Sequence, residues 1–199
     1  GRFSADEQGG IQFESFTQEL KLASNFDGSF NFVLGASYLE DDNEFTLGYM
    51  GIAFGYFLLG RTEHDIESTS FYFDGSYELT DALTVTAGVR NTEDDQDLTT
   101  FAFGATGKDS SSFSDTTYRV VLDYDISDTL MVYGSFNTGF KSGGFNGSWF
   151  GPTPEVLPEE IDSFELGAKY FGGSFSFEAA FFDYDWENLQ VAVLSNDAG

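Results

Sequence analysis

Histidine and cysteine are the first side chains to examine for chemistry, since imidazole and thiolate groups serve as metal ligands and nucleophiles. The 199-residue chain has one histidine, His64, and no cysteine. Carboxylates would have to complete any metal site, and disulfides, thiolate sites and cysteine nucleophiles are excluded. We therefore expect no metal site and no bound cofactor.

Carboxylates offer a second kind of chemistry, because general acid and base catalysis often uses a pair of them. Asp183 with Asp185, and Glu159 with Glu160, are such pairs in the sequence. No apolar pocket that would raise one pKa is legible around them, and a Ser, His and Asp triad would depend on His64 alone. No phosphate-binding glycine loop with Lys and Ser or Thr occurs either. We predict no catalytic residue and no enzymatic activity.

The charge balance limits the partners. The 34 acidic and 8 basic residues give a net charge of −26. Nucleic acid is a poor partner for such a chain, because phosphate binding needs Lys and Arg to displace counterions. Solubility of exposed loops, divalent-cation bridging to anionic lipopolysaccharide and a salt-rich habitat each explain the acidity, and all three stay open here.

The composition favours strands over helices. The chain has 24 Phe, 10 Tyr and 23 Gly against 3 Pro, as expected for many strands joined by turns. No apolar run approaches the roughly 20 residues of a membrane helix. If the chain crosses a membrane it must do so as a barrel, because only helices and closed sheets pair all their backbone groups in lipid.

The alternation of apolar and polar residues predicts four hairpins with short turns, the first at Asp27-Gly28. The other three turns fall at 80–81, 127–128 and 172–173. Long loops are expected at 41–65, at 91–114 and after Lys141. Short turns alternating with long loops are typical of outer-membrane barrels. We predict an all-β fold, an antiparallel up-and-down meander of about eight strands.

One parity of the expected strands is consistently apolar, which predicts the lipid-facing side of such a barrel. These predicted lipid-facing residues are Phe71, Phe73, Tyr77, Leu83, Val85, Val120, Leu122, Leu130 and Val132.

Three segments in order carry a family resemblance: GFKSGGFN, then PEEIDSFELGAKY, then AAFFDYDWENLQV. FESFTQELKLAS and FDGSYELTDALTVTAGVRNTED extend it over nearly the whole chain. Together they closely resemble the C-terminal barrel half of the TonB-dependent outer-membrane receptors. The resemblance implies that the meander is part of a large transmembrane β-barrel. We therefore expect residues 1–199 to be a partial receptor barrel, with the plug domain and the remaining strands elsewhere in a longer protein.

The resemblance implies a function in the bacterial outer membrane. Receptors of this family import scarce nutrients, and a ferric siderophore is the default expectation, with cobalamin or glycans as alternatives. The implied partners are outer-membrane lipid and lipopolysaccharide, a small-molecule ligand such as a ferric siderophore, and the TonB-ExbB-ExbD complex acting through the plug. A passive porin-type channel and a soluble β-rich binding module remain as competing classes.

Two aromatic segments in the expected long loops are candidates for ligand contact, because large apolar side chains there would otherwise reduce solubility. The candidate ligand-contacting residues are Tyr49, Phe54, Tyr56, Phe145, Trp149 and Phe150. The alternative for both segments is packing against neighbouring loops or the barrel rim.

Overall fold

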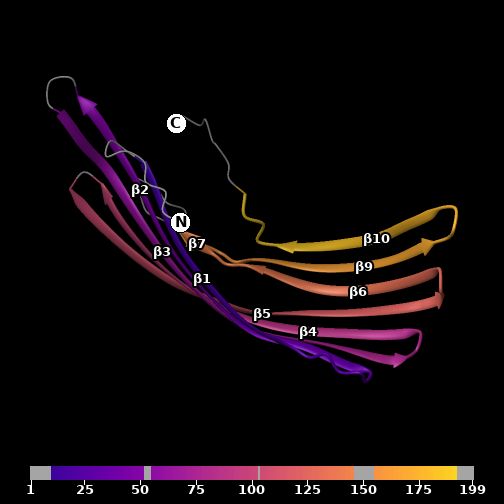
Figure 1. Ribbon diagram of the computed structural model, residues 1–199. Helices are drawn as coiled ribbons and strands as arrows, with labels where there is room; N and C mark the ends of the chain where they lie inside the picture. The colour runs from indigo at the N-terminus through magenta and orange to yellow at the C-terminus, as the bar shows by residue number, and fades with distance from the viewer. Residues whose placement is uncertain (1–9, 52–54, 103, 146–154, 192–199) are drawn as a thin grey trace.

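The computed structural model describes residues 10–51, 55–102, 104–145 and 155–191 (Figure 1). One antiparallel sheet has the order β1-β2-β3-β4-β5-β6-β9-β10, and a separate two-stranded sheet pairs β7 with β8. The main sheet consists of β1 (Gly10–Ala23), β2 (Phe30–Gly51), β3 (Gly55–Thr80), β4 (Leu83–Ala102), β5 (Ala105–Ser127), β6 (Leu130–Lys141), β9 (Glu159–Phe171) and β10 (Ser176–Glu187). The short pair is β7 (Gly144–Phe145) and β8 (Glu155–Val156). The predicted all-β meander of about eight strands is confirmed.

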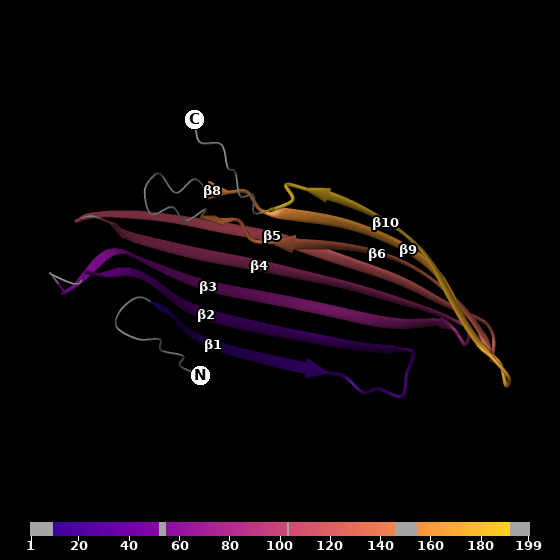
Figure 2. The same cartoon turned by 90° about the horizontal axis from the view of Figure 1, so that it is seen from above.

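The sheet is curved and open (Figures 1 and 2). Each strand pairs with its neighbour in the order, so β1 bonds only to β2 and β10 only to β9 within the described ranges. In the same part of the chain, no helix has the length and apolar character needed to cross a membrane.

All four predicted short turns are present, and they lie at one end of the sheet. They connect β1 to β2, β3 to β4, β5 to β6 and β9 to β10. At the first turn, the Asn31 side chain accepts hydrogen bonds from the Ser24 hydroxyl at 2.9 Å and the Phe26 amide at 2.8 Å. The side chain therefore closes the turn by satisfying groups that the ladder leaves unpaired.

At the opposite end, two of the three predicted long loops are wrong. Residues 41–51 and 55–65 continue β2 and β3 as a paired hairpin, and 91–102 and 105–114 continue β4 and β5 in the same way. The acidic and Gly/Ser-rich composition suggested loops, but the backbone ladder extends through it because both partners of each hairpin keep their register. Among the described residues, those after Lys141 leave the main sheet, and β7 and β8 pair between β6 and β9.

The strand register shows which side chains share a face of the sheet, so it tests the prediction of an apolar side. Rows such as Leu34, Phe73, Val89 and Tyr118 run straight across β2 to β5 on one face. All nine predicted lipid-facing residues lie on this side, which we call the apolar face. Phe73 is 41% exposed and its ring stacks on Phe32 at 5.9 Å, so the face has no protein layer over it there. Contact with lipid stays a prediction.

Farther from the short turns, the same face carries acidic side chains instead of apolar ones. Two rows of directly opposed carboxylates cross the long strands: Glu14, Asp42, Asp65 and Asp97, and Glu40, Glu67 and Asp95. We call these the acidic rows. A membrane strand needs about 9–11 residues, and β3 has 26. The long strands therefore extend well beyond an apolar layer, and the acidic rows lie on that extension.

Carboxylates placed directly opposite one another repel. Partial desolvation, followed by repulsion from Asp42, Glu63 and Asp97, raises the pKa of Asp65 above its ordinary value near 3.8. A carboxyl group whose pKa is higher in the folded state than in the unfolded state stabilises the folded state at pH values below its unfolded pKa. This advantage is lost as the pH rises through the folded pKa, so the charge of Asp65 destabilises the extension at neutral pH.

Phe73→Arg is expected to destabilise the lipid-embedded barrel by about 2–4 kcal/mol, the cost of a cation facing the bilayer centre. Glu67→Arg is the matched control on the same strand and face, and it should cost nothing because it lies in an acidic row. Unfolding in lipid vesicles measures both. Cysteines at 73 and 74 check the facing, and a reactive 73 beside an unreactive 74 would invert it.

Asp65→Asn should stabilise the folded protein at pH 7 by about 0.2–1 kcal/mol, the usual size of a cross-strand pair effect. Below the unfolded pKa of Asp65 the two proteins should unfold alike, because the carboxyl is then neutral in both states. Urea titrations at pH 7 and pH 3 measure the difference, and an equal gain at both values would contradict the role of charge.

Candidate functional site

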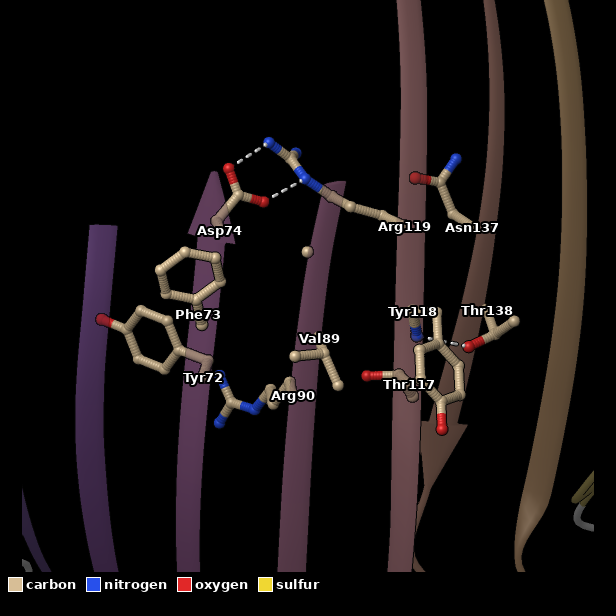
Figure 3. Close-up of a pocket in the computed structure, with 11 residues that line it drawn as sticks. Tyr72, Phe73, Asp74, Val89, Arg90, Thr117, Tyr118, Arg119, Asn137 and Thr138 are labelled. Atoms are coloured by element: carbon tan, nitrogen blue, oxygen red, sulfur yellow. Dashed lines mark hydrogen bonds and ion pairs between the residues drawn. The ribbon is translucent and has the colours of Figure 1, made fainter. Parts of the chain in front are cut away.

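The face opposite the apolar face carries the polar groups, and we call it the polar face. A shallow groove of about 340 Å³ lies there on β3, β4, β5 and β6, and Phe73, Val89 and Tyr118 also contribute to its lining (Figure 3). Its polar lining includes Tyr72, Asp74, Arg90, Thr117, Arg119 and Asn137. Alternation along each strand brings these residues to one side, and the ladder brings the four strands together.

An ion pair crosses one whole strand in this groove. Arg119 on β5 donates two hydrogen bonds to Asp74 on β3, at 2.7 and 3.1 Å (Figure 3). Gly88 on β4 lies between them, and a Cβ there would collide with the Asp74 carboxylate. The glycine therefore gives the pair the space to lie flat against the sheet.

The same arrangement recurs on the β1 side of the groove. Tyr72 passes over Gly35 and donates to Glu19 at 2.6 Å. At Gly88 and at Gly35, the absence of a side chain on the intervening strand lets a large polar group reach two strands away.

Tyr133 lies over Gly167 and donates to Glu165 on β9, while the Lys169 ammonium lies 5.3 Å from the Tyr133 ring centre. Glu165 and Lys169 therefore both contact Tyr133 on the neighbouring strand, which their spacing along β9 does not predict.

Arg90 differs from the other arginine of the groove. It contacts the Tyr72 ring at 5.8 Å, and it makes two long hydrogen bonds, to Thr92 at 3.3 Å and to Ser37 at 3.5 Å. Within the described ranges it forms no ion pair with a carboxylate. The Glu19 carboxylate interacts electrostatically with Arg90, and Asp115 lies on the same face, opposite Thr92.

A second polar cluster holds the long connection against the sheet. Gln96 on β4 is 6% exposed, and its amide nitrogen donates to the Gly143 carbonyl at 2.9 Å and to the Ser142 hydroxyl at 3.2 Å. Its amide oxygen lies 3.1 Å from Nε2 of His64. His64 is therefore part of a hydrogen-bonded anchor.

The other side of this connection is held by Gln190, just beyond β10. Its side-chain nitrogen donates to the carbonyls of Ser142 and Leu157, both at 3.0 Å, and its backbone amide donates to Glu159 at 3.1 Å. Glu159 also pairs with Lys141 at 3.7 Å. The base of the connection is thus fixed from both sides.

Some of the candidate ligand-contacting residues lie in the described part of the chain and others do not. Phe145 lies in β7 with its ring centre 6.2 Å from that of His64. The backbones of Tyr49 and Tyr56 lie opposite Phe57 and Met50 near the end of the β2–β3 hairpin. Phe54, Trp149 and Phe150 fall outside the described residues. Ligand contact by all six stays a prediction.

The carboxylate pairs do not form a catalytic arrangement. Glu159 is buried and engaged with Lys141, whereas the adjacent Glu160 points to the opposite face. Asp183 and Asp185 lie on the edge strand, opposite Phe164 and Asp162. Across the described ranges, no group of three or more His, Asp or Glu side chains is placed to hold a metal ion.

Sequence reasoning did not single out Arg90, Arg119 or Gln96 as site residues. The sequence offered one signal for the two arginines, a basic residue at a position predicted to lie on the polar side of a strand in a very acidic chain. Pairing across Gly88 needs the strand register, and the Gln96 contacts need the long connection to fold back, so neither follows from local spacing.

The sequence matches, over residues 2–199, the family described as TonB dependent receptor-like, beta-barrel. The fold is similar to that of the ferric yersiniabactin uptake receptor FyuA from Yersinia pestis, with a TM-score of 0.79 and 21% identity over 94% of this chain and 30% of that one. No curated protein matches the chain.

Two further solved structures are similar. The ferric citrate transporter FecA has a TM-score of 0.67 and 16% identity over 99% of this chain and 35% of that one. The copper transporter OprC has a TM-score of 0.68 and 13% identity over 86% of this chain and 29% of that one. The chain spans about a third of the length of these proteins, and at such identities the likeness is one of fold.

Gly88→Ala is expected to break the ion pair between Asp74 and Arg119, at a cost of about 0.5–1 kcal/mol because the pair is partly exposed. In an Asp74→Asn background the same change should cost little. Gly28→Ala is the control, since a Cβ there meets nothing within 4 Å. Urea unfolding of the four combinations measures the coupling, and an equal cost in both backgrounds would show that Gly88 does not act through Asp74.

Proposed function

The chain belongs to the TonB-dependent receptors, as part of their β-barrel, and from this membership we propose that it forms part of an outer-membrane barrel that actively imports a scarce nutrient. The observation that carries the proposal is the division of one sheet into an apolar face and a polar face lined by charged groups. A barrel wall needs the first toward lipid and the second toward its interior. The match to the family over residues 2–199 supports the same reading.

A ferric siderophore is the proposed ligand. Two of the similar solved structures are described as a ferric yersiniabactin uptake receptor and a ferric citrate transporter, which favours an iron-bearing ligand. A copper transporter shares the fold as well, so the fold is compatible with other cargo. Cobalamin and glycans are the alternatives within the family.

The proposed mechanism assigns energy coupling to other parts of the receptor. A plug domain inside the barrel would contact TonB, and the TonB-ExbB-ExbD complex would supply the work that opens a path. The residues of this chain contribute the barrel wall and the base of an outer connection, fixed by Gln96 and Gln190. The acidic rows would face lipopolysaccharide above the lipid layer, where divalent cations neutralise phosphates and carboxylates together.

Uptake by whole cells tests the function. A strain that carries the full-length receptor as its only siderophore receptor should accumulate ferric siderophore, and removal of TonB should abolish this uptake. Uptake that persists without TonB would indicate a passive channel. Uptake of cobalamin or a glycan, but no ferric siderophore, would correct the ligand and keep the class.

Replacement of Trp149 and Phe150 together by Ala is expected to weaken ligand binding about tenfold or more, because aromatic side chains often dominate binding contacts. Phe71→Ala is the control, an aromatic residue on the apolar face, for which affinity should not change. Ligand titration measures affinity, and heat-modifiable gel mobility confirms folding. Unchanged affinity in a folded double variant would leave these residues a packing role only.

A further inference from the structure

A second groove lies near the ends of β3, β4 and β5 that are farthest from the short turns. It has a volume of about 310 Å³ and is lined by Arg61, Glu63, Thr99, Phe101 and Thr106. The ladder brings these residues together in two rows, because Phe101 lies opposite both Arg61 and Thr106, and Thr99 lies opposite Glu63. Both rows belong to the apolar face, so we call this site the outer groove. It lies on the other side of the sheet from the groove that holds Arg119.

The charged groups of the outer groove balance one another. The Arg61 guanidinium contacts the carboxylates of Glu44 at 2.8 Å and Glu63 at 2.5 Å. Lys108 lies opposite Thr99, at the end of the second row. These two acidic and two basic side chains leave no net charge to select a phosphate or a metal ion. Their oxygen and nitrogen atoms can still form hydrogen bonds with the hydroxyl groups of a neutral ligand.

An aromatic ring between hydroxyls and paired charges suits a carbohydrate. The Phe101 side chain is partly buried, between Arg61 on one strand and Thr106 on the next. A sugar ring packs the C–H groups of one face on an aromatic ring, and its hydroxyls point outward to polar groups around that ring. Small-molecule sites combine aromatic walls with a few polar groups in this way, and a volume near 310 Å³ is at the lower end of their range.

The height of the outer groove favours sugar over phosphate. Arg61 lies ten residues beyond Phe71 along β3, which is about 33 Å of strand. Because barrel strands tilt by about 35–45°, the groove would lie roughly 25 Å above the level of Phe71. In lipopolysaccharide, phosphates are concentrated near the acyl chains and a chain of sugars continues outward. The acidic rows lie between the groove and the apolar residues, and their carboxylates repel phosphates.

We propose that the outer groove binds the saccharide part of neighbouring lipopolysaccharide, with one sugar ring on Phe101 and its hydroxyls bonded to Glu63, Thr99 and Thr106. This inference rests on the proposed function, since only a barrel in the outer membrane has lipopolysaccharide beside its wall. It adds to that function a recognition site for the sugar chain, outside the path of the imported nutrient.

Binding of core oligosaccharide to the full-length receptor in detergent tests the site. The probe is the lipid-free oligosaccharide that mild acid releases from the lipopolysaccharide of the expressing strain, and saturation-transfer NMR measures its affinity. Phe101→Ala should weaken binding about three- to tenfold, the change expected for the loss of one aromatic contact. Phe101→Tyr should retain binding because it keeps the ring.

Phe45→Ala is the matched control. Phe45 lies opposite Thr62, next to Arg61 in sequence, and therefore on the polar face at a similar height. Its replacement should leave oligosaccharide affinity unchanged. Thr106→Val gives a second test if Phe101→Ala misfolds, since it keeps the shape and removes one hydroxyl, and it should weaken binding severalfold.

Four results would overturn the proposal. Oligosaccharide that fails to bind the unaltered receptor, or that binds Phe101→Ala equally well, would exclude the site. Equal weakening by Phe45→Ala would mean that aromatic side chains bind the sugar without regard to face. Weakening by Lys108→Gln alone would show contact with a phosphate of the oligosaccharide. Equal affinity for maltopentaose would show a general carbohydrate site that is not directed at lipopolysaccharide.

The outcome is separable from that of the proposed function. Phe101→Ala should leave TonB-dependent uptake unchanged, because the outer groove lies on the face away from the barrel interior. Phe101-dependent oligosaccharide binding in a receptor without TonB-dependent uptake would contradict the import role and keep the sugar site. TonB-dependent uptake with oligosaccharide binding that does not depend on Phe101 would do the reverse.

Discussion

The structure depends on one constraint, the two-residue period of the β-strand combined with a continuous backbone ladder. In lipid every backbone N–H and C=O must be paired within the protein, and the ladder does this along each pair of neighbouring strands. Once the register is set, each side chain is committed to one face. The apolar rows around Phe73 and the polar groove around Arg119 are the two sides of that single arrangement.

Glycine gives the polar face its particular geometry. Strands lie close to 4.8 Å apart, so side chains on adjacent strands normally fill the space over the sheet. At Gly88, Gly35 and Gly167 that space is empty, and a charged or phenolic group from the next strand lies across it. The polar face therefore holds its charges flat, in bridges that tie three strands together or join neighbouring pairs, and a shallow groove lies among them.

The long strands have outer parts that the short strands lack. β2 to β5 continue far beyond the length that an apolar layer requires, and the outer parts of β2, β3 and β4 carry carboxylates that repel across the ladder. The backbone ladder must outweigh this repulsion, because the hairpins remain paired through it. Dissolved salt screens repulsion of this kind between exposed charges.

The sequence by itself determined the faces and the short turns. Period-two alternation placed Phe71, Val85 and Leu122 on one side, and Asp27-Gly28 and Gly172-Gly173 marked turns that the structure contains. These signals are local: a residue's face follows from its parity, and a turn follows from its own few residues. The motifs around Lys141 and Glu165 likewise identified the family that the comparison found.

Only the tertiary structure decided where the ladders end and which polar groups meet. Acidic stretches at 41–44 and 93–97 read as loops, yet they are strands, because pairing with a partner in register outweighs composition. The bridge from Asp74 to Arg119 joins residues 45 apart, and Gln96 meets Gly143 across 47. Such contacts depend on strand order and on a connection folding back over the sheet, which no local pattern encodes.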